Sequence, residues 1–122
     1  VERPAKLLAY DSKLRLAVAR GPIQSKVVPL LPDLDRRLRK DQWVVTIRHG
    51  KKGKAIPHAG TVNRKRTKWG RVAELRAQLG APILDLKGRL VGVVRGGTRR
   101  RANILPIRRI MPFLRSAVLG SD

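Results

Sequence analysis

The chain of 122 residues carries 29 Lys and Arg against 8 Asp and Glu, a formal net charge of +21 at pH 7. Hydrophobic residues make up 42% of the sequence, which is enough for one core and excludes wholesale disorder. The absence of Cys excludes a disulfide framework, a thiolate zinc site and a Cys nucleophile, and no apolar run is long enough for membrane insertion. The first six residues have no signal-peptide pattern and no initiator Met, which predicts a processed or incomplete N-terminus.

Alternating polar and apolar residues predict short strands through most of the chain. Residues 14–18 and 43–47 alternate with period two. Residues 54–62 form a weaker candidate, because Pro57 is typical of an edge strand or a bulge. Residues 85–88 predict a tight hairpin turn in which Gly88 adopts a positive φ. Further strands are expected at 72–75, 82–84, 90–94 and 102–105. This spacing is typical of an all-β barrel or sandwich.

The C-terminal segment has a different pattern. Apolar residues recur at helical spacing from Ile107 to Val118, which predicts one amphipathic helix. Gly120 is the expected C-cap. Pro112 is expected in the first turn, where its missing N–H does no harm. The prediction is therefore six strands from Trp43 onward, followed by one helix.

The basic residues gather in four runs, 36–40, 48–54, 64–71 and 95–101. Three of the runs contain Gly and all lie between apolar segments, which places them on loops or turns. Such a charge usually meets an anionic partner, either nucleic acid, a membrane face or an acidic protein. Arg supplies 19 of the 29 cations, and its planar fork matches phosphate oxygens two at a time, which favours nucleic acid.

Four segments in order resemble one family, the HtrA/DegP-type trypsin-like serine proteases. Residues 10–18 (YDSKLRLAV) resemble the segment around the catalytic Asp, and residues 38–47 (LRKDQWVVTI) resemble the first strand of the second barrel. Residues 79–93 (LGAPILDLKGRLVGV) resemble the segment that carries the nucleophile. Residues 103–114 (NILPIRRIMPFL) resemble the approach to the closing helix.

The resemblance implies an all-β, trypsin-like fold. Residues 1–20 would be a remnant hairpin of the first barrel and residues 21–41 a connector. Residues 42–122 would form the second, six-stranded β-barrel with its C-terminal α-helix, and Trp43 would lie in the core. Without the rest of the first barrel, the Lys6–Arg20 hairpin would expose apolar residues. We therefore expect a neighbouring protein of a large assembly to cover Leu7, Leu14, Leu16 and Val18.

The departures from the family predict a pseudoprotease without catalytic residues. Leu79 occupies the position of the nucleophilic Ser, and Leu has no nucleophilic atom. Arg15 occupies the position of the catalytic Asp, and a cation there cannot stabilise an imidazolium. The segment of the catalytic His would precede Val1. Two His without Cys or clustered acids predict no metal site, and no cofactor motif is present.

We therefore expect a non-catalytic RNA-binding structural protein, a ribosomal or other ribonucleoprotein subunit that contacts rRNA phosphates. It would act in the cytosol or in an organelle such as the mitochondrion. The alternatives are an inactive HtrA-like protein that binds peptides or regulates a protease, and a basic viral capsid protein on the same barrel. Trp69 could stack on a base or pack on the barrel. The expected RNA contacts are Arg64, Lys65, Arg66, Lys68, Trp69, Arg71, Arg99, Arg100 and Arg101, followed by Arg48, Lys51, Lys52 and Lys54.

Overall fold

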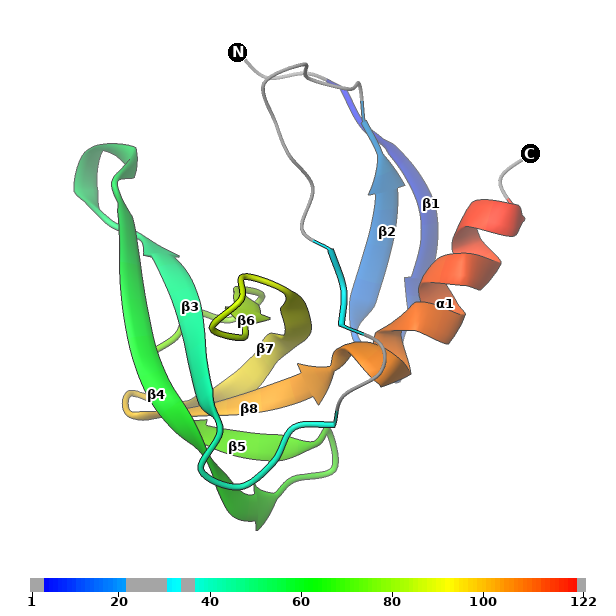
Figure 1. The fold of residues 1–122 in the computed structure, drawn as a ribbon. Coiled ribbons are helices and arrows are strands. Elements are labelled where there is room, and N and C mark those ends of the chain that lie inside the picture. The colour runs from blue at the N-terminus through cyan, green and yellow to red at the C-terminus, as the bar shows by residue number, and fades with distance from the viewer. Residues whose placement is uncertain (1–3, 22–30, 34–36, 121–122) are drawn as a thin grey trace. The chain divides into compact units, whose positions relative to one another are not determined.

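The computed structural model describes residues 4–21, 31–33 and 37–120. The chain divides into two compact units, one formed by Val1–Pro29 with Arg108–Asp122 and the other by Leu30–Ile107. Most of the predicted connector 21–41 lies outside the described residues. Figure 1 shows the elements of both units.

The larger unit is a closed antiparallel barrel. Its strands are β3 (Trp43–His49), β4 (Ala55–Arg66), β5 (Arg71–Glu74), β6 (Pro82–Leu84), β7 (Leu90–Thr98) and β8 (Arg101–Pro106). They close in the order β3-β4-β5-β8-β7-β6, and a short 3-10 helix, η1 (Lys51–Gly53), connects β3 to β4. The structure thus confirms the prediction of six strands from Trp43 onward, followed by a helix, within the part of the chain that it describes.

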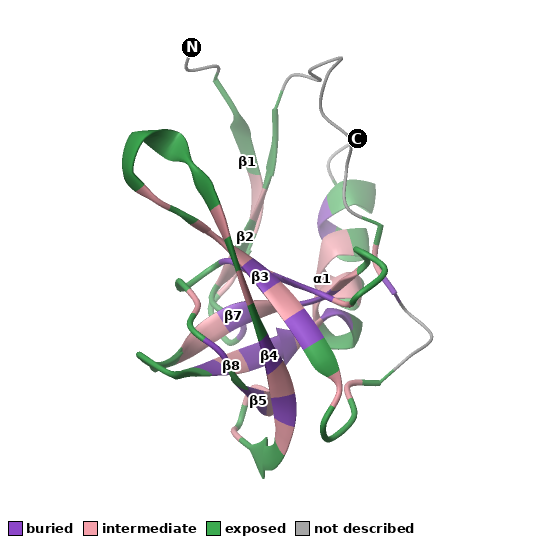
Figure 2. Ribbon diagram, turned by 60° about the vertical axis from the view of Figure 1, so that its left-hand side comes forward, coloured by how far each residue is buried: buried purple, intermediate pink, exposed green. Residues whose placement is uncertain are grey.

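Period-two alternation builds the core of the barrel. Val44, Val62, Ile83 and Ile104 point inward and are fully buried, and buried residues alternate with more exposed ones along the strands (Figure 2). The expectation that Trp43 lies in the core is wrong, since its side chain is 53% exposed. The reason is the register, because Val44 occupies the inward position and its neighbour must face outward.

The distal halves of β3 and β4 form a two-stranded ribbon. The two strands pair along their whole length, from Trp43↔Thr61 to His49↔Ala55. However, β6 pairs with β3 only at Val45 and Thr46, and β5 pairs with β4 only from Thr61 onward. Both edges of the ribbon are therefore open. Pro57 lies on one of these edges, as expected, although β4 is continuous and extends to Arg66.

Gly60 permits the close approach of β4 to β5. A Cβ at this position would collide with the carbonyl oxygen of Glu74 and with the Cβ of Leu75. Because backbone atoms cannot move aside cheaply, Gly60→Ala is expected to lower the free energy of unfolding by about 1–3 kcal/mol. Urea unfolding followed by circular dichroism measures this change. Ala59→Ser, at the exposed neighbouring position, should change stability by less than about 0.5 kcal/mol.

The smaller unit contains the hairpin of β1 (Lys6–Asp11) and β2 (Leu16–Arg20), together with α1 (Ile107–Leu119). The carboxylate of Asp11 closes the hairpin turn by accepting hydrogen bonds from the backbone N–H groups of Lys13 and Leu14, at 2.9 and 3.0 Å. Leu14 is buried, whereas Leu7 is 63% exposed. From Arg108 onward α1 belongs to the same unit as this hairpin, whereas the sequence places it with segment 42–122.

Pro112 lies inside α1 and not in its first turn, so that expectation is wrong. The helix begins at Ile107, directly after β8, and Pro112 is therefore in the second turn. There its missing N–H cannot donate to the carbonyl of Arg108. Gly120 follows the end of the helix as expected, and its N–H donates to the carbonyl oxygen of Ser116 at 3.0 Å. Among the described residues, no helix is both long and apolar enough to cross a bilayer.

Candidate nucleic-acid interface

The basic run 64–71 occupies the end of β4, a tight turn and the start of β5. Arg64, Lys65 and Arg66 are exposed, and Arg66 pairs across the two strands with Arg71. Thr67 shapes the turn, because its N–H donates to the carbonyl oxygen of Gly70 at 2.7 Å and its hydroxyl accepts from the N–H of Trp69 at 3.2 Å. These cations therefore project from the ends of two paired strands and not from the loop that the sequence pattern had indicated.

Trp69 is partly buried between two cations. Its ring centroid lies 5.0 Å from the Nζ of Lys68 and 4.9 Å from the guanidinium carbon of Arg95, distances typical of cation–π contacts. Arg95 belongs to β7, so the ring of Trp69 packs against the barrel. This is one of the two interpretations that the sequence allowed. Base stacking by Trp69 stays a prediction.

Arg95 is a residue of this surface that the sequence-based contact set omits. It lies at the register shift between Val94 and Gly96, and its Nε is buried without a hydrogen-bond partner among the described residues. The sequence places Arg95 in the basic run 95–101, but nothing in that run indicates a contact with Trp69. Only the pairing order of the barrel brings the turn after β4 close to β7.

The run 99–101 forms the turn between β7 and β8. Arg99 and Arg100 are exposed at its tip, because Thr98 pairs with Arg101 across the hairpin. The Nε of Arg101 lies 3.2 Å from Oε1 of Glu74, and the same oxygen accepts a hydrogen bond from the side-chain amide of Asn63 at 2.9 Å. Glu74 thus ties β8 to β5 and β4, and it partly neutralises Arg101.

A surface cavity of about 550 Å³ lies beside this turn. Arg76, Arg99 and Arg100 line it together with Glu74 and Leu75. Arg76 is a second residue that the sequence-based set omits, since it stands alone between Leu75 and Ala77. Three guanidinium groups around one cavity, facing a single carboxylate among its lining residues, favour an anionic ligand.

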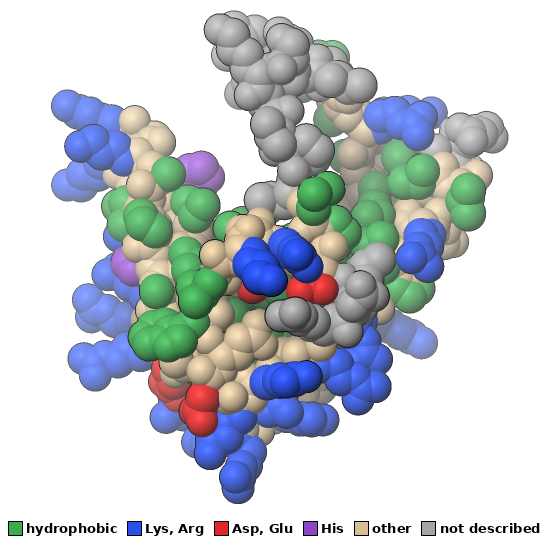
Figure 3. Space-filling view, viewed as in Figure 1, with side chains coloured by type: hydrophobic (Ala, Val, Ile, Leu, Met, Phe, Trp, Pro, Cys, Tyr) green, Lys and Arg blue, Asp and Glu red, His purple; other side chains and the backbone are tan. Residues whose placement is uncertain are grey.

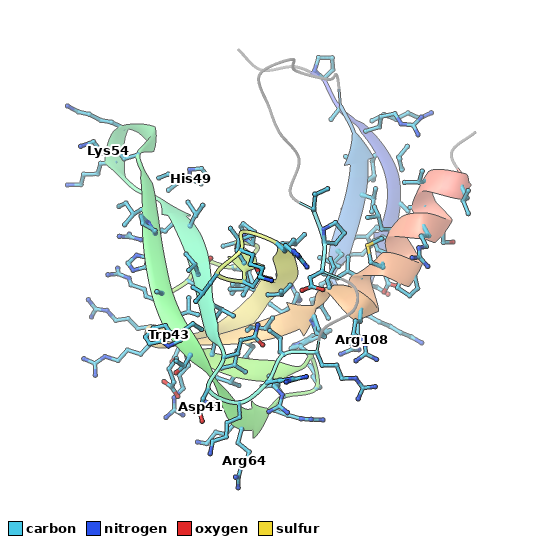
Figure 4. All side chains as sticks on the ribbon, viewed as in Figure 1. Asp41, Trp43, His49, Lys54, Arg64 and Arg108 are labelled. Carbon is cyan, nitrogen blue, oxygen red and sulfur yellow. The ribbon has the colours of Figure 1, made fainter. Side chains whose placement is uncertain are left out.

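The run 48–54 lies at the tip of the ribbon and apart from the other two. Lys51, Lys52 and Lys54 are exposed, whereas Arg48 is partly buried and its Nε donates to Nε2 of His58 at 3.3 Å. Since β4 runs twelve residues from this tip to Arg66, the run lies at the other end of β4 from Arg64 (Figure 4). The structure therefore places runs 64–71 and 99–101 at the two ends of the short strand β5, and leaves run 48–54 at the far end of β4.

Few carboxylates offset this positive charge. Within the described residues between 31 and 107, the acids are Asp33, Asp41, Glu74 and Asp85. Asp33 is buried and lies 3.8 Å from a guanidinium nitrogen of Arg89. Asp85 accepts hydrogen bonds from the N–H groups of Lys87 and Arg89 in its own turn. Figure 3 shows Lys and Arg spread widely over one face and only small areas of Asp and Glu. The barrel therefore carries a strongly positive field.

The structure places Leu79 and Arg15, the two residues that the resemblance assigned to catalytic positions, in turns. Leu79 lies between β5 and β6 and is 70% exposed. It precedes Gly80, whose N–H donates to the carbonyl oxygen of Val94 at 2.8 Å. Arg15 lies in the turn of the first hairpin with a φ of 54° and is exposed. The described residues contain no group of three His, Asp or Glu side chains that could hold a metal ion.

Comparisons with known proteins bear on the fold. No protein-family model and no curated protein match the sequence. The structure is similar to the crystal structure of Rv3671c from M. tuberculosis H37Rv, a Ser-to-Ala mutant in an inactive form. The TM-score is 0.72 at 18% sequence identity, and the match covers 98% of this chain and 67% of that one. The chain therefore has a trypsin-like fold, as the resemblance implied.

Proposed function

We propose that this chain is a non-catalytic RNA-binding structural protein, a subunit of the ribosome or of another ribonucleoprotein. The observation that carries the proposal is that two basic runs meet on the barrel: Arg95 of run 95–101 lies against the ring of Trp69 in run 64–71. Beside them, Glu74 holds Arg101 and Asn63, the residue before run 64–71. We call this surface the RNA face. It consists of Arg64, Lys65, Arg66, Lys68, Trp69, Arg71, Arg76, Arg95, Arg99, Arg100 and Arg101. The lysines at the ribbon tip, Lys51, Lys52 and Lys54, and Arg48 near the end of β3 would make secondary contacts.

The RNA face would bind through phosphate groups. Each Lys or Arg that neutralises a phosphate releases a condensed counterion, so the affinity should fall steeply with salt concentration. Trp69 is the aromatic residue of this face, and one ring cannot form a platform for successive bases. The surface therefore fits the backbone and shape of folded RNA better than a single strand.

The absence of protease activity is the second part of the proposal. Because Leu79 cannot act as a nucleophile, the direct test restores one with Leu79→Ser. We expect no cleavage of fluorescein-labelled casein by this variant, since Arg15 stands at the carboxylate position and Ala77 replaces a glycine of the oxyanion turn. The parent chain is the matched control. Cleavage by the parent chain would contradict this part, and cleavage by the variant alone would mean that Leu79 is the one catalytic defect.

The first test of RNA binding uses the native particle, because a chain of net charge +21 binds many polyanions at low salt. The experiment is sedimentation of a lysate from the cells that express the chain, with and without RNase, followed by immunodetection. We expect the chain to migrate with a large particle that RNase disrupts. Migration as a small species that RNase does not change would overturn the proposal and favour the peptide-binding alternative.

A further inference from the structure

The outer face of the β3–β4 ribbon is apolar and lies outside the RNA face. Because Val44 and Thr46 point into the barrel, their neighbours Trp43, Val45 and Ile47 face outward. The paired positions on β4 that share this face are occupied by Ala55, Pro57, Ala59 and Thr61. We call this surface the ribbon face. Figure 3 shows hydrophobic side chains gathered over β3 and β4, and Figure 4 labels Trp43 and His49 at the two ends of β3.

A basic cavity adjoins the Trp43 end of the ribbon face. It measures about 620 Å³, and its apolar lining is formed by Trp43 and Leu86, which are 53% and 71% exposed. The cations around it are Arg37, Arg39, Lys40 and Lys87. Two acids, Asp41 and Asp85, also line the cavity, but Asp85 is engaged by the N–H groups of its own turn. The rim therefore carries an excess of positive charge.

The chemistry of this surface favours a protein over RNA. Phosphates and bases gain little from aliphatic groups, whereas Val45, Ile47 and Leu86 could bury their area against apolar side chains of a partner. The seven residues of β3 span roughly 20 Å, and two strands are about 10 Å wide with their side chains. A helix of about 13 residues has the same length and a similar width.

We propose that the ribbon face and its basic cavity bind an amphipathic helix with acidic flanks from a protein partner. Apolar residues at i, i+3, i+4 and i+7 would lie along Trp43, Val45 and Ile47, and one of them would enter the cavity beside Leu86. Acidic residues at the flanks would meet Arg39, Lys40 and Lys87 at the rim. The site shares no residue with the RNA face, and the secondary contacts Arg48 and Lys54 lie beside its far end.

The experiment uses a synthetic probe and the full chain. The probe is a fluorescein-labelled helical peptide of 16 residues with Leu at the four positions above and Glu on both flanks, and its binding is followed by anisotropy. One matched peptide has the same composition in scrambled order, and another has Lys in place of Glu. We expect the acidic amphipathic peptide to bind about tenfold more tightly than either one.

Two sets of charge-removing variants separate this site from the RNA face. Peptide binding should weaken about fivefold or more in the rim variant, Arg39→Gln/Lys40→Gln/Lys87→Gln. The same loss is expected for the single variant Leu86→Ser. Arg64→Gln/Lys65→Gln/Arg66→Gln removes the same number of charges and should leave peptide binding within about twofold. Both Leu86 and the rim cations are exposed, so these variants should fold.

Two results would overturn the proposal. Equal binding of the scrambled peptide would mean that charge alone attracts the probe and that the apolar face contributes nothing. A loss of RNA affinity in the rim variant as large as in the 64–66 variant would mean that this surface belongs to the RNA interface. Failure of RNA binding with retained peptide binding would overturn the proposed function and support this site.

Discussion

Replacing Arg64, Lys65 and Arg66 together by Gln is expected to weaken binding to folded RNA by about 10- to 100-fold near physiological salt. All three side chains are exposed at the end of β4, and among the described residues none of them forms an ion pair at the distances seen for Arg101 and Arg89. Each phosphate contact that is lost should also lower the slope of log affinity against log salt concentration by about one. The substitutions therefore act on affinity and on salt dependence together.

The measurement is an equilibrium titration of a folded RNA hairpin at several salt concentrations. The matched control is Arg39→Gln/Lys40→Gln/Lys87→Gln, which removes the same net charge at the other surface. Its affinity should fall much less, because exposed charges farther apart than about 8–10 Å are largely screened at this ionic strength. An equal loss in both variants would show that net charge, and not the RNA face, governs binding.

Ile104→Ala is expected to lower the free energy of unfolding by about 2–5 kcal/mol. Ile104 lies on β8, is fully buried and packs in the cluster that fills the barrel with Val44, Val62 and Val94. Its truncation removes apolar area from the core and leaves a cavity that a closed barrel cannot collapse around. For a small domain such a loss is a large part of the total stability.

Urea unfolding of the variant and the parent measures this loss. Leu79→Ala is the control, because it removes a similar volume from a side chain that is 70% exposed. It should change stability by less than about 0.5 kcal/mol. A change for Ile104→Ala as small as that of the control would mean that Ile104 is not part of the core.

The strands were predictable wherever a local pattern sets the structure. The alternation at 43–47 and the turn at 85–88 needed no long-range information, and Gly88 has the expected positive φ, 79°. The prediction for Trp43, made from its place at the start of a strand and from the resemblance, failed, because neither says which of two apolar faces is inside. The closed barrel decides this, since it can enclose only the face that carries Val44.

The surface was predictable as a set of basic runs but not as an arrangement. Arg95 and Arg76 carry no local signal of their role, since the contact of Arg95 with Trp69 depends on strands distant in the sequence. The position of Pro112 was also decided non-locally. The helix begins where β8 ends, at a residue that helical periodicity does not specify.

Composition, charge and the alternation of side chains established a basic, all-β chain with a terminal helix, because these properties depend on neighbours within a few residues. The strand order, the closure of the barrel and the register of the strands decided where the side chains lie relative to one another. They bring Arg95 of β7 against Trp69, tie Arg101 to Asn63 through Glu74, leave Lys51, Lys52 and Lys54 at the far end of β4, and turn Trp43 outward. These positions depend on which strands pair with each other. Strand pairing in turn depends on packing between residues far apart in the sequence, and no single segment contains that information.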